Sequence, residues 1–478
     1  MTEEVTQAVE TSILPHLLTV VGFLMAVFAI ARLASEKRQP GNTLAWLLGI
    51  LLIPYVGVPL YLLFGGRKLR RISRRKRPVI LHLPGIPPVS PDISILSTPH
   101  TLASSGACLP AGGNTVRLIT NGEQAFTELE TLINGAQHSI HIGTFILGRD
   151  DTGRRIVNLL AKRAREGVKV RLQLDALGCF FSSRSFVDVL RRAGGEIVRF
   201  MPVIPLSSRS SANLRNHRKI AVFDQHTAIV GGHNLAREYM GAQHLKKRWS
   251  DFGAVITGPA AALLNEVFLA DWAFASRQSL DTLHEELDPT AVRTEGSSAV
   301  QIVASGPDVH GDPLYEGIIS MIQEAETSIW VITPYFIPDE VLLRSLIVKA
   351  RAGKDVTLIV PAKSNHPIAD YARRHYLRQL RKAGARIMHH TGRMMHSKAI
   401  IVDDRIGLLG SANFDLRSLF VNFEIGVFLY SEPDVLAMRA WAGELLRECI
   451  EPKPEPRRRT RIWGNIIEDL SRLLAPLL

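Results

Sequence analysis

HRKIAVFD at residues 217–224 and HSKAIIVD at residues 396–403 are two copies of one pattern, a His, a Lys two positions later and an Asp at the end. An Asn stands seventeen residues after each His, at Asn234 and Asn413. Residues two apart on an extended strand point to the same face, so each copy presents an imidazole beside a fixed positive charge. The four apolar residues that follow each Lys predict a buried strand. Two matched copies in one chain predict one active site built from two halves.

The bare pattern also occurs a third time, as HLKKRWSD at residues 244–251. Between Lys246 and Asp251 this copy has KRWS where the others have an apolar strand, and Ala261 stands where the others have Asn. We therefore interpret the match at His244 as a coincidence in a basic surface segment.

Longer stretches around the motifs repeat with a period of about 180 residues. The paired segments are 132–156 with 321–343, 160–175 with 347–362, and 190–200 with 380–390. Helical patterns alternate with β-branched runs in both members of each pair, which predicts an α/β fold. The long period indicates duplicated domains rather than a solenoid. We expect two similar α/β sandwich domains, at 113–285 and 298–450, that face each other across a shared cleft.

With these features the chain resembles the phospholipase D superfamily, and over nearly its whole length it is similar to bacterial cardiolipin synthases of the two-transmembrane type. The resemblance implies that His217 and His396 are the nucleophile and the general acid/base, with attack assigned to His217 by precedent. It also implies a set of side chains that hold the phosphate oxygens: Lys219, Lys398, Asn234, Asn413 and, as a lesser contributor, Ser411. A carboxylate behind each His is expected as well, and the matching positions are Asp251 and Glu424. Gly232 stands where the second copy has Ser411, which bears on headgroup or acceptor choice more than on the chemistry.

The last members of the two motifs, Asp224 and Asp403, are counted with the catalytic residues. Both follow the predicted strand and have the opposite parity to the His. A structural role, bonding turn amides or a basic neighbour, therefore stays open for them.

The chemistry explains why such residues are needed. Displacement at a phosphodiester requires a nucleophile, a proton for the leaving alkoxide, and positive charge near the phosphoryl oxygens. A neutral imidazole would attack phosphorus and give a phosphohistidine, while the other His, protonated, donates to the departing oxygen. Two His, two Lys and two Asn meet these needs, so we expect neither a metal ion nor another cofactor.

Two apolar stretches predict a membrane hairpin at 1–66, with transmembrane spans at about 13–33 and 44–64. A cleaved signal peptide is disfavoured because acidic residues, rather than Lys or Arg, precede the first stretch. Pro54 and Pro59 leave a broken or re-entrant second element open as an alternative.

Basic segments flank the duplicated region. RKLRRISRRKR opens the segment 67–112, which continues as a Pro-rich linker. This run contains more basic residues than the loop between the two predicted spans. This asymmetry predicts that the catalytic part lies in the cytoplasm, close to anionic lipid. The resemblance implies a multi-pass protein of the bacterial inner membrane. Residues 457–478 set apolar residues at helical spacing behind an arginine run. They predict an amphipathic helix, either on the membrane surface or packed on the protein.

The net charge of +12 fits either nucleic acid or anionic lipid, and the apolar hairpin favours lipid. The resemblance implies phosphatidyl transfer between two phosphatidylglycerol molecules, giving cardiolipin and glycerol. A membrane-bound phospholipase D, or a phosphatidyltransferase with another headgroup, would use the same site and stays open. A membrane-tethered nuclease is a third hypothesis, but no nucleic acid partner is expected because an aromatic-interleaved basic groove is lacking.

Overall fold

The computed structural model describes residues 2–34, 40–64, 76, 87, 89–182, 184–202, 214–288 and 290–452. The amphipathic helix predicted at 457–478 lies outside the described residues. The chain divides into two compact units, a small one made mainly of residues 1–69 and a large one that holds the rest.

The described helices of the small unit are α1 (Thr2–Ala34), α2 (Pro40–Leu52) and α3 (Pro54–Phe64). The second apolar stretch is broken at Ile53, because Pro54 has no amide hydrogen and opens a new helix. The two helices pack closely at this break, since a Cβ atom on Gly57 would lie 2.1 Å from the carbonyl oxygen of Gly49. The broken element that the prolines left open is the form observed.

Within the described ranges, no helix is both long enough and apolar enough to cross a membrane. The transmembrane spans predicted at about 13–33 and 44–64 are therefore not supported. For the second span the physical reason is the break, which leaves helices of 13 and 11 residues in place of one continuous helix.

Two short helices belong to the Pro-rich linker, α5 (Pro91–Ser94) and α6 (Ser97–Ser104). Ile93, Leu96 and Leu102 from this region are buried in the core of the second half. Over these residues the linker is part of the packed interior of the large unit.

Two matching series of helices and strands follow the linker. The first half contains β1 (Ala111–Ile119), α7 (Gly122–Gly135), β2 (Ser139–Thr144), α8 (Asp151–Arg165), β3 (Lys169–Asp175), α9 (Arg184–Arg192), β4 (Glu196–Phe200), β5 (Ile220–Phe223), β6 (Thr227–Gly231), β7 (Gly253–Thr257), α10 (Pro259–Ser276) and α11 (Leu280–Glu285). The second half contains β8 (Ser298–Ser305), α12 (Pro313–Glu324), β9 (Ser328–Ile332), β10 (Phe336–Ile337), α13 (Glu340–Arg351), β11 (Asp355–Pro361), α14 (Pro367–Lys382), β12 (Arg386–His390), β13 (Ala399–Val402), β14 (Ile406–Gly410), β15 (Phe414–Asp415), α15 (Leu416–Phe420), β16 (Glu424–Leu429), α16 (Glu432–Arg447) and β17 (Cys449–Ile450).

The strands form one fifteen-stranded sheet, with β10 and β15 paired separately. Its order is β17-β12-β11-β9-β13-β14-β16-β8-β1-β7-β6-β5-β2-β3-β4. Read outward from the central β8–β1 pair, the order β8-β16-β14-β13-β9-β11-β12 in one half matches β1-β7-β6-β5-β2-β3-β4 in the other. This correspondence confirms the repeats found in the sequence and the mixed α/β class. The antiparallel pairing of β1 with β8, which sets Asn114 opposite Ser298, joins the halves edge to edge and was not predicted.

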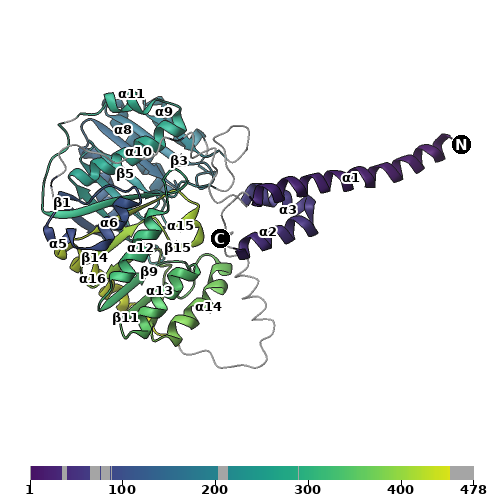
Figure 1. Cartoon of the computed structure of the whole chain (residues 1–478). Helices are drawn as coiled ribbons and strands as arrows, with labels where there is room; N and C mark the ends of the chain where they lie inside the picture. The colour runs from purple at the N-terminus through teal and green to yellow at the C-terminus, as the bar shows by residue number, and fades with distance from the viewer. Residues whose placement is uncertain are drawn as a thin grey trace. The chain divides into compact units, whose positions relative to one another are not determined.

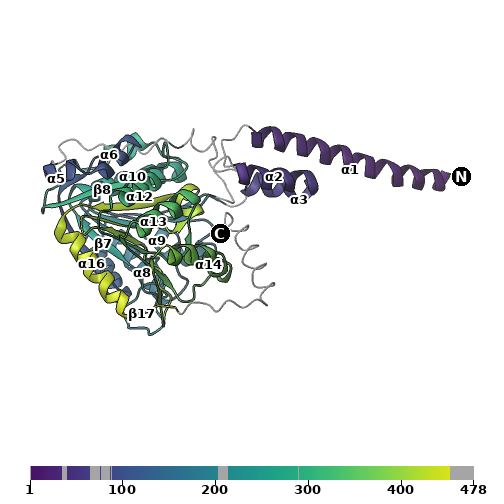
Figure 2. The same cartoon turned by 60° about the horizontal axis from the view of Figure 1, so that its bottom comes forward.

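Helices pack on the sheet in both halves (Figure 1). In the second half α12, α13 and α14 lie next to one another and bury a shared apolar core against the strands (Figure 2). A further core cluster draws on both halves through α10 and α16, and in it the ring of Phe252 stacks on Trp441 with centroids 3.7 Å apart. The halves are thereby held in a fixed register, which is what a site shared between them requires.

Candidate functional site

Each motif His lies just before a strand, His217 before β5 and His396 before β13. The backbone at both points pairs with the opposite half. The amide of His217 donates to the carbonyl of Phe423 at 2.9 Å, and the amide of His396 donates to the carbonyl of Ser250 at 2.7 Å. Because Phe423 and Ser250 directly precede Glu424 and Asp251 in the chain, these hydrogen bonds bring each His beside a carboxylate of the other half.

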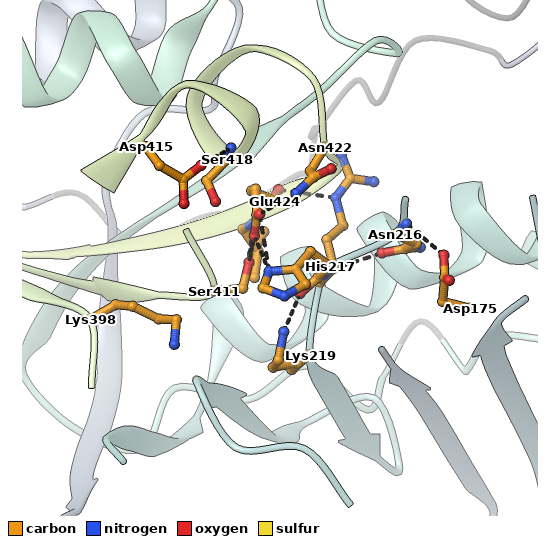
Figure 3. A network of polar contacts seen from close by, with 12 residues as sticks. Asp175, Asn216, His217, Lys219, Lys398, Ser411, Asp415, Ser418, Asn422 and Glu424 are labelled. Carbon is orange, nitrogen blue, oxygen red and sulfur yellow. Dashed lines mark hydrogen bonds and ion pairs between the residues drawn. The ribbon is translucent and has the colours of Figure 1, made fainter. Parts of the chain in front are cut away.

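The two imidazoles and the two carboxylates are exchanged between the halves. Nδ1 of His217 lies 3.1 Å from Oε1 of Glu424, and Nδ1 of His396 lies 2.7 Å from Oδ2 of Asp251. Both carboxylates are fully buried. Figure 3 shows the first pair, with Lys219 close to the same imidazole. Since Nδ1 of each ring is occupied, Nε2 is the atom that each His can offer to a substrate.

Burial and charge set the protonation of the site. Burial lowers the pKa of His217, and the opposing effect of Glu424 does not cancel it. Burial and the charge of Lys398 lower the pKa of His396 to about 3, against the effect of Asp251. Burial raises the pKa of Asp251, but its partners His396 and Lys398 outweigh it and bring the pKa below its ordinary value. At neutral pH the free site therefore holds neutral imidazoles hydrogen-bonded to ionised carboxylates.

The motif lysines bring positive charge to both imidazoles. Nζ of Lys219 donates to the carbonyl of His217 at 2.8 Å, and Nζ of Lys398 lies 2.8 Å from Nδ1 of His396. Burial lowers the pKa of Lys219 to about 7 and that of Lys398 to about 8. Each lysine also lowers the pKa of the His in the opposite half. The four residues thus share one electrostatic environment.

The two asparagines are buried beside the site. Oδ1 of Asn234 accepts the amide of Ile146 at 3.0 Å, and the same side chain bonds the hydroxyl of Tyr239. The side chain of Asn413 bonds Asp415, and its Oδ1 is a buried polar atom with no hydrogen-bond partner among the described residues.

Ser411 lies against a carboxylate. Its hydroxyl donates to Glu424 and accepts the amide of Ile425 at 3.0 Å. The structure therefore places this residue, expected at the phosphate, behind the imidazole of His217. At the matching position a Cβ atom on Gly232 would lie 2.0 Å from Oδ1 of Asp251. The glycine leaves room for the close approach of Asp251, which gives the difference between the two copies a local packing reason.

Asp224 and Asp403 lie at the far ends of their strands from the histidines. The carboxylate of Asp224 accepts the backbone amides of Gln137, His138 and Ser139 at 2.7 to 2.8 Å. Asp403 binds the equivalent turn of the second half, including the amides of Thr327 and Ser328. Their geometry is that of turn-capping residues, which favours the structural role that the sequence left open for them.

The first and last residues of the third copy of the pattern, at 244–251, lie in different environments. The side chain of His244 is 76% exposed and pairs with Glu123 at 3.2 Å on the surface. Asp251, the last residue of the match, is instead the buried partner of His396.

Aromatic rings border the imidazoles and were not predicted. Phe145 contacts His217 edge to face with centroids 4.8 Å apart. Tyr239 and Trp249 contact His396 at 5.1 and 5.5 Å. The one signal in the sequence was that Trp249 stands two residues before Asp251.

Comparisons with known proteins show the family of the chain. A family model described as cardiolipin synthase, PLD-like domain, matches residues 129–272 and 318–446, and a phospholipase D-nuclease N-terminal model matches 24–66. The chain is 34% identical over 464 residues to a cardiolipin synthase of Geobacillus kaustophilus, covering 95% of this chain and 92% of that protein. It is also 34% identical over 484 residues to cardiolipin synthase 1 of Bacillus cereus, covering 96% and 92%.

A solved structure shows the same fold at low identity. The phosphatidylserine synthase of Haemophilus influenzae aligns with a TM-score of 0.59 and 15% identity, covering 80% of this chain and 98% of that one. Together with the family match over both halves and the full-length similarity to curated relatives, the repeated site leads to one conclusion: the chain belongs to the cardiolipin synthase family, with domains of the phospholipase D type.

Proposed function

We propose that the chain is a phosphatidyltransferase that converts two phosphatidylglycerol molecules into cardiolipin and glycerol. The observation that carries the proposal is the pair of exchanged His–carboxylate contacts, His217 with Glu424 and His396 with Asp251. They provide a nucleophile and a proton carrier in one buried site that also contains Lys219 and Lys398. The names of the full-length relatives supply the lipid class.

In the first step Nε2 of His217 attacks the phosphorus of phosphatidylglycerol. A P–N bond forms, the bond from phosphorus to the headgroup glycerol oxygen breaks, and protonated His396 gives its proton to that oxygen. The substrate itself helps to charge His396, because the bound phosphodiester anion raises the pKa of a nearby imidazole. Glycerol leaves, and a phosphatidyl group remains on His217.

In the second step His396 is the base. It removes the proton from a glycerol hydroxyl of the second phosphatidylglycerol, whose oxygen attacks phosphorus and breaks the P–N bond. Cardiolipin forms and His217 is again neutral. Nδ1 of each ring stays bonded to its carboxylate, which keeps Nε2 facing the substrate in both steps.

We propose that the phosphoryl oxygens are held by Lys219, Lys398, Asn234 and Asn413. The two lysines are buried and close to both imidazoles, and negative charge on the transferred group stabilises their charged forms. Asp224, Asp403 and Ser411 are assigned no contact with phosphate.

We also propose that the small N-terminal unit attaches the enzyme to the bacterial inner membrane, with the catalytic unit on the cytoplasmic side. Large apolar side chains of α1 are exposed, among them Leu17, Phe23 and Phe28 at 57 to 67%. A surface of this kind favours contact with lipid. The match of residues 24–66 to an N-terminal domain model of the superfamily supports the same role.

The products test the proposal. The full chain is incubated with vesicles of phosphatidylglycerol, and lipid and water-soluble products are separated. Cardiolipin and glycerol in equal amounts are expected, and both should vanish in His217→Ala. Phosphatidic acid without cardiolipin would replace the proposal by hydrolysis, and products that need an added alcohol would point to another headgroup acceptor.

A further inference from the structure

Directly after His217 in the chain, Arg218 belongs to a buried cluster of four charges. The other members are Lys76, Asp271 and Asp308, and each of the four is at most 4% exposed. Lys76 forms ion pairs with both aspartates. Arg218 pairs with Asp271 at 2.7 Å and with Asp308 at 3.2 Å. Two positive and two negative charges balance, and such balance is what allows charged groups to be buried together.

Lys76 reaches this cluster from outside the duplicated halves. Asp271 lies on α10, Asp308 follows β8, and Arg218 lies between the two motif residues of the first half. Lys76 instead comes from the basic run at 67–77, whose charges were predicted to face anionic lipid. At 2% exposure its side chain is instead buried in the interior of the large unit.

The cluster touches the backbone on both sides of the His217–Glu424 contact. Nε of Arg218 donates to the carbonyl of Glu424 at 3.0 Å. Nζ of Lys76 and the guanidinium of Arg218 lie 5.2 and 5.4 Å from the ring centroid of Phe423. The carbonyl of that same Phe423 accepts the amide of His217.

A second connection runs through Asn216, the residue before His217. Its Nδ2 donates to Asp271 at 2.9 Å, its Oδ1 accepts the amide of Arg218 at 3.0 Å, and its own amide donates to Asp175 at 3.0 Å (Figure 3). Asp271, which forms an ion pair with Lys76, therefore also binds the residue that directly precedes His217.

We infer that Lys76 is a positioning residue for the His217–Glu424 pair, which it acts on through Arg218, Asp271 and Phe423. The inference rests on the proposed role of His217. Without Lys76 the cluster would keep one positive and two negative charges, and the uncompensated negative charge would remain buried beside the nucleophile. The role also ties the basic run after the N-terminal helices directly to the reacting half-site.

The effect of this charge on His217 has a defined sign. The charged groups that face His217 are Glu424 from β16, Lys398 from the start of β13, and Lys219 from its own segment. An added net negative charge behind them raises the pKa of the imidazole, so a larger share of the nucleophile is protonated at a given pH. The acidic limb of kcat/KM, which reports the free enzyme, must then move to higher pH.

The test uses the full chain in detergent micelles of phosphatidylglycerol, with kcat and the pH profile of kcat/KM as readouts. Lys76→Met should lower kcat/KM at pH 7 by up to a few fold and move the acidic limb up by about one pH unit. Lys76→Arg, which keeps the charge, should retain most activity. Asp308→Asn alone leaves a net positive cluster and should move the limb to lower pH. Combining Lys76→Met with Asp308→Asn restores neutrality and should return the limb toward its wild-type position.

Lys246→Met is the matched control, because it removes one positive charge from an exposed position. It should leave the kcat and the acidic limb unchanged. A wild-type limb in both Lys76→Met and Asp308→Asn would overturn the inference. So would a loss of kcat in Lys76→Met that is equal at every pH and is not recovered in the double variant, since that is the behaviour of a purely structural residue.

Two comparisons keep the inference separate from the proposed function. If Lys76→Met does not fold, Asp308→Asn alone still tests the sign of the shift. Wild type and His217→Ala are assayed in the same series. Failure of wild type to form cardiolipin, or activity in His217→Ala, would contradict the proposed function itself, whereas normal behaviour of both beside an unshifted Lys76→Met contradicts only the role of Lys76.

Discussion

Asp251 and His396 are 145 residues apart in the chain, yet Oδ2 of Asp251 lies 2.7 Å from Nδ1 of His396. The reciprocal contact joins Glu424 of the second half to His217 of the first. Each half therefore contributes an imidazole and the carboxylate that orients the other imidazole. Neither half contains a complete site, which explains on physical grounds why both copies of the motif are present in one chain.

Replacing the exchanged carboxylates should damage chemistry more than folding. In Asp251→Asn and in Glu424→Gln the shape is kept, but the charge that holds the imidazole tautomer and stabilises the imidazolium is lost. We expect kcat to fall by roughly a hundredfold or more in each, with little change in KM. Steady-state kinetics with phosphatidylglycerol measure the effect, and His244→Ala, on the surface, is the control. A kcat within a few fold of wild type in both variants would contradict the orienting role.

The motif aspartates should behave in the opposite way. Asp403→Ala leaves several turn amides without their acceptor, and we expect the free energy of unfolding to fall by about 1–3 kcal/mol. Activity per folded molecule should be nearly unchanged. Hydrogen bonds from the turn outweigh the effect of burial and lower the pKa of Asp403. Because the pKa of Asp403 is lower in the folded state than in the unfolded state, the ionised carboxylate stabilises the fold at pH values above the ordinary pKa of an aspartate. This stabilisation is lost as the pH falls through the pKa of the folded state.

Denaturation curves at pH 7 and at acidic pH check this prediction, because the difference between wild type and Asp403→Ala should shrink on acidification. Asp224→Ala tests the equivalent turn of the first half. A variant that folds normally but has lost its activity would restore the catalytic grouping of these residues.

Most of the fold that could be predicted came from patterns among residues close together in the sequence. The apolar runs after Lys219 and Lys398 are strands, and the paired segments found by repetition occupy matching places in the sheet. The break at Pro54 also follows from a local property, the missing amide hydrogen. Such features depend on neighbours in sequence, which a single chain displays directly.

The contacts that complete the site depend on distant residues. The pairing of His217 with Glu424 spans 207 residues, and that of Lys76 with Asp308 spans 232. Nothing in HRKIAVFD indicates which carboxylate will face the imidazole. Lys76 stands in a run of basic residues, a composition that is typical of a solvent-exposed segment. The third motif match shows the same limit, because Asp251 reaches the site through the fold and not through its spacing from His244.

The difference between Gly232 and Ser411 leads to an asymmetric prediction. Gly232→Ser places a Cβ atom 2.0 Å from Oδ1 of Asp251, so the carboxylate must move away from His396. We expect kcat to fall at least about a hundredfold, as for the loss of the carboxylate itself. Ser411→Gly removes one hydrogen bond to Glu424 and should cost about tenfold or less. Kinetics of the two single variants decide the point, and equal effects would show that the two positions are interchangeable.

The buried lysines set the basic limb of the pH profile. Because burial lowers the pKa of Lys219 to about 7 and that of Lys398 to about 8, the free enzyme loses positive charge at the phosphate site as the pH rises through this range. We therefore expect kcat/KM to decline above about pH 7 and more steeply above about pH 8, while the profile of kcat is displaced to higher pH because bound phosphate favours the charged lysines. In Lys398→Arg the guanidinium stays protonated, so only the loss of charge on Lys219 remains and kcat/KM should fall less steeply above about pH 8, even though the altered geometry lowers the maximum. Profiles of wild type and Lys398→Arg between pH 6 and 10 measure both effects. A wild-type kcat/KM that stays constant to pH 10 would mean that the lysine charges are held by the free site, and the stabilisation would then have to come from Asp251 and Glu424 rather than from substrate.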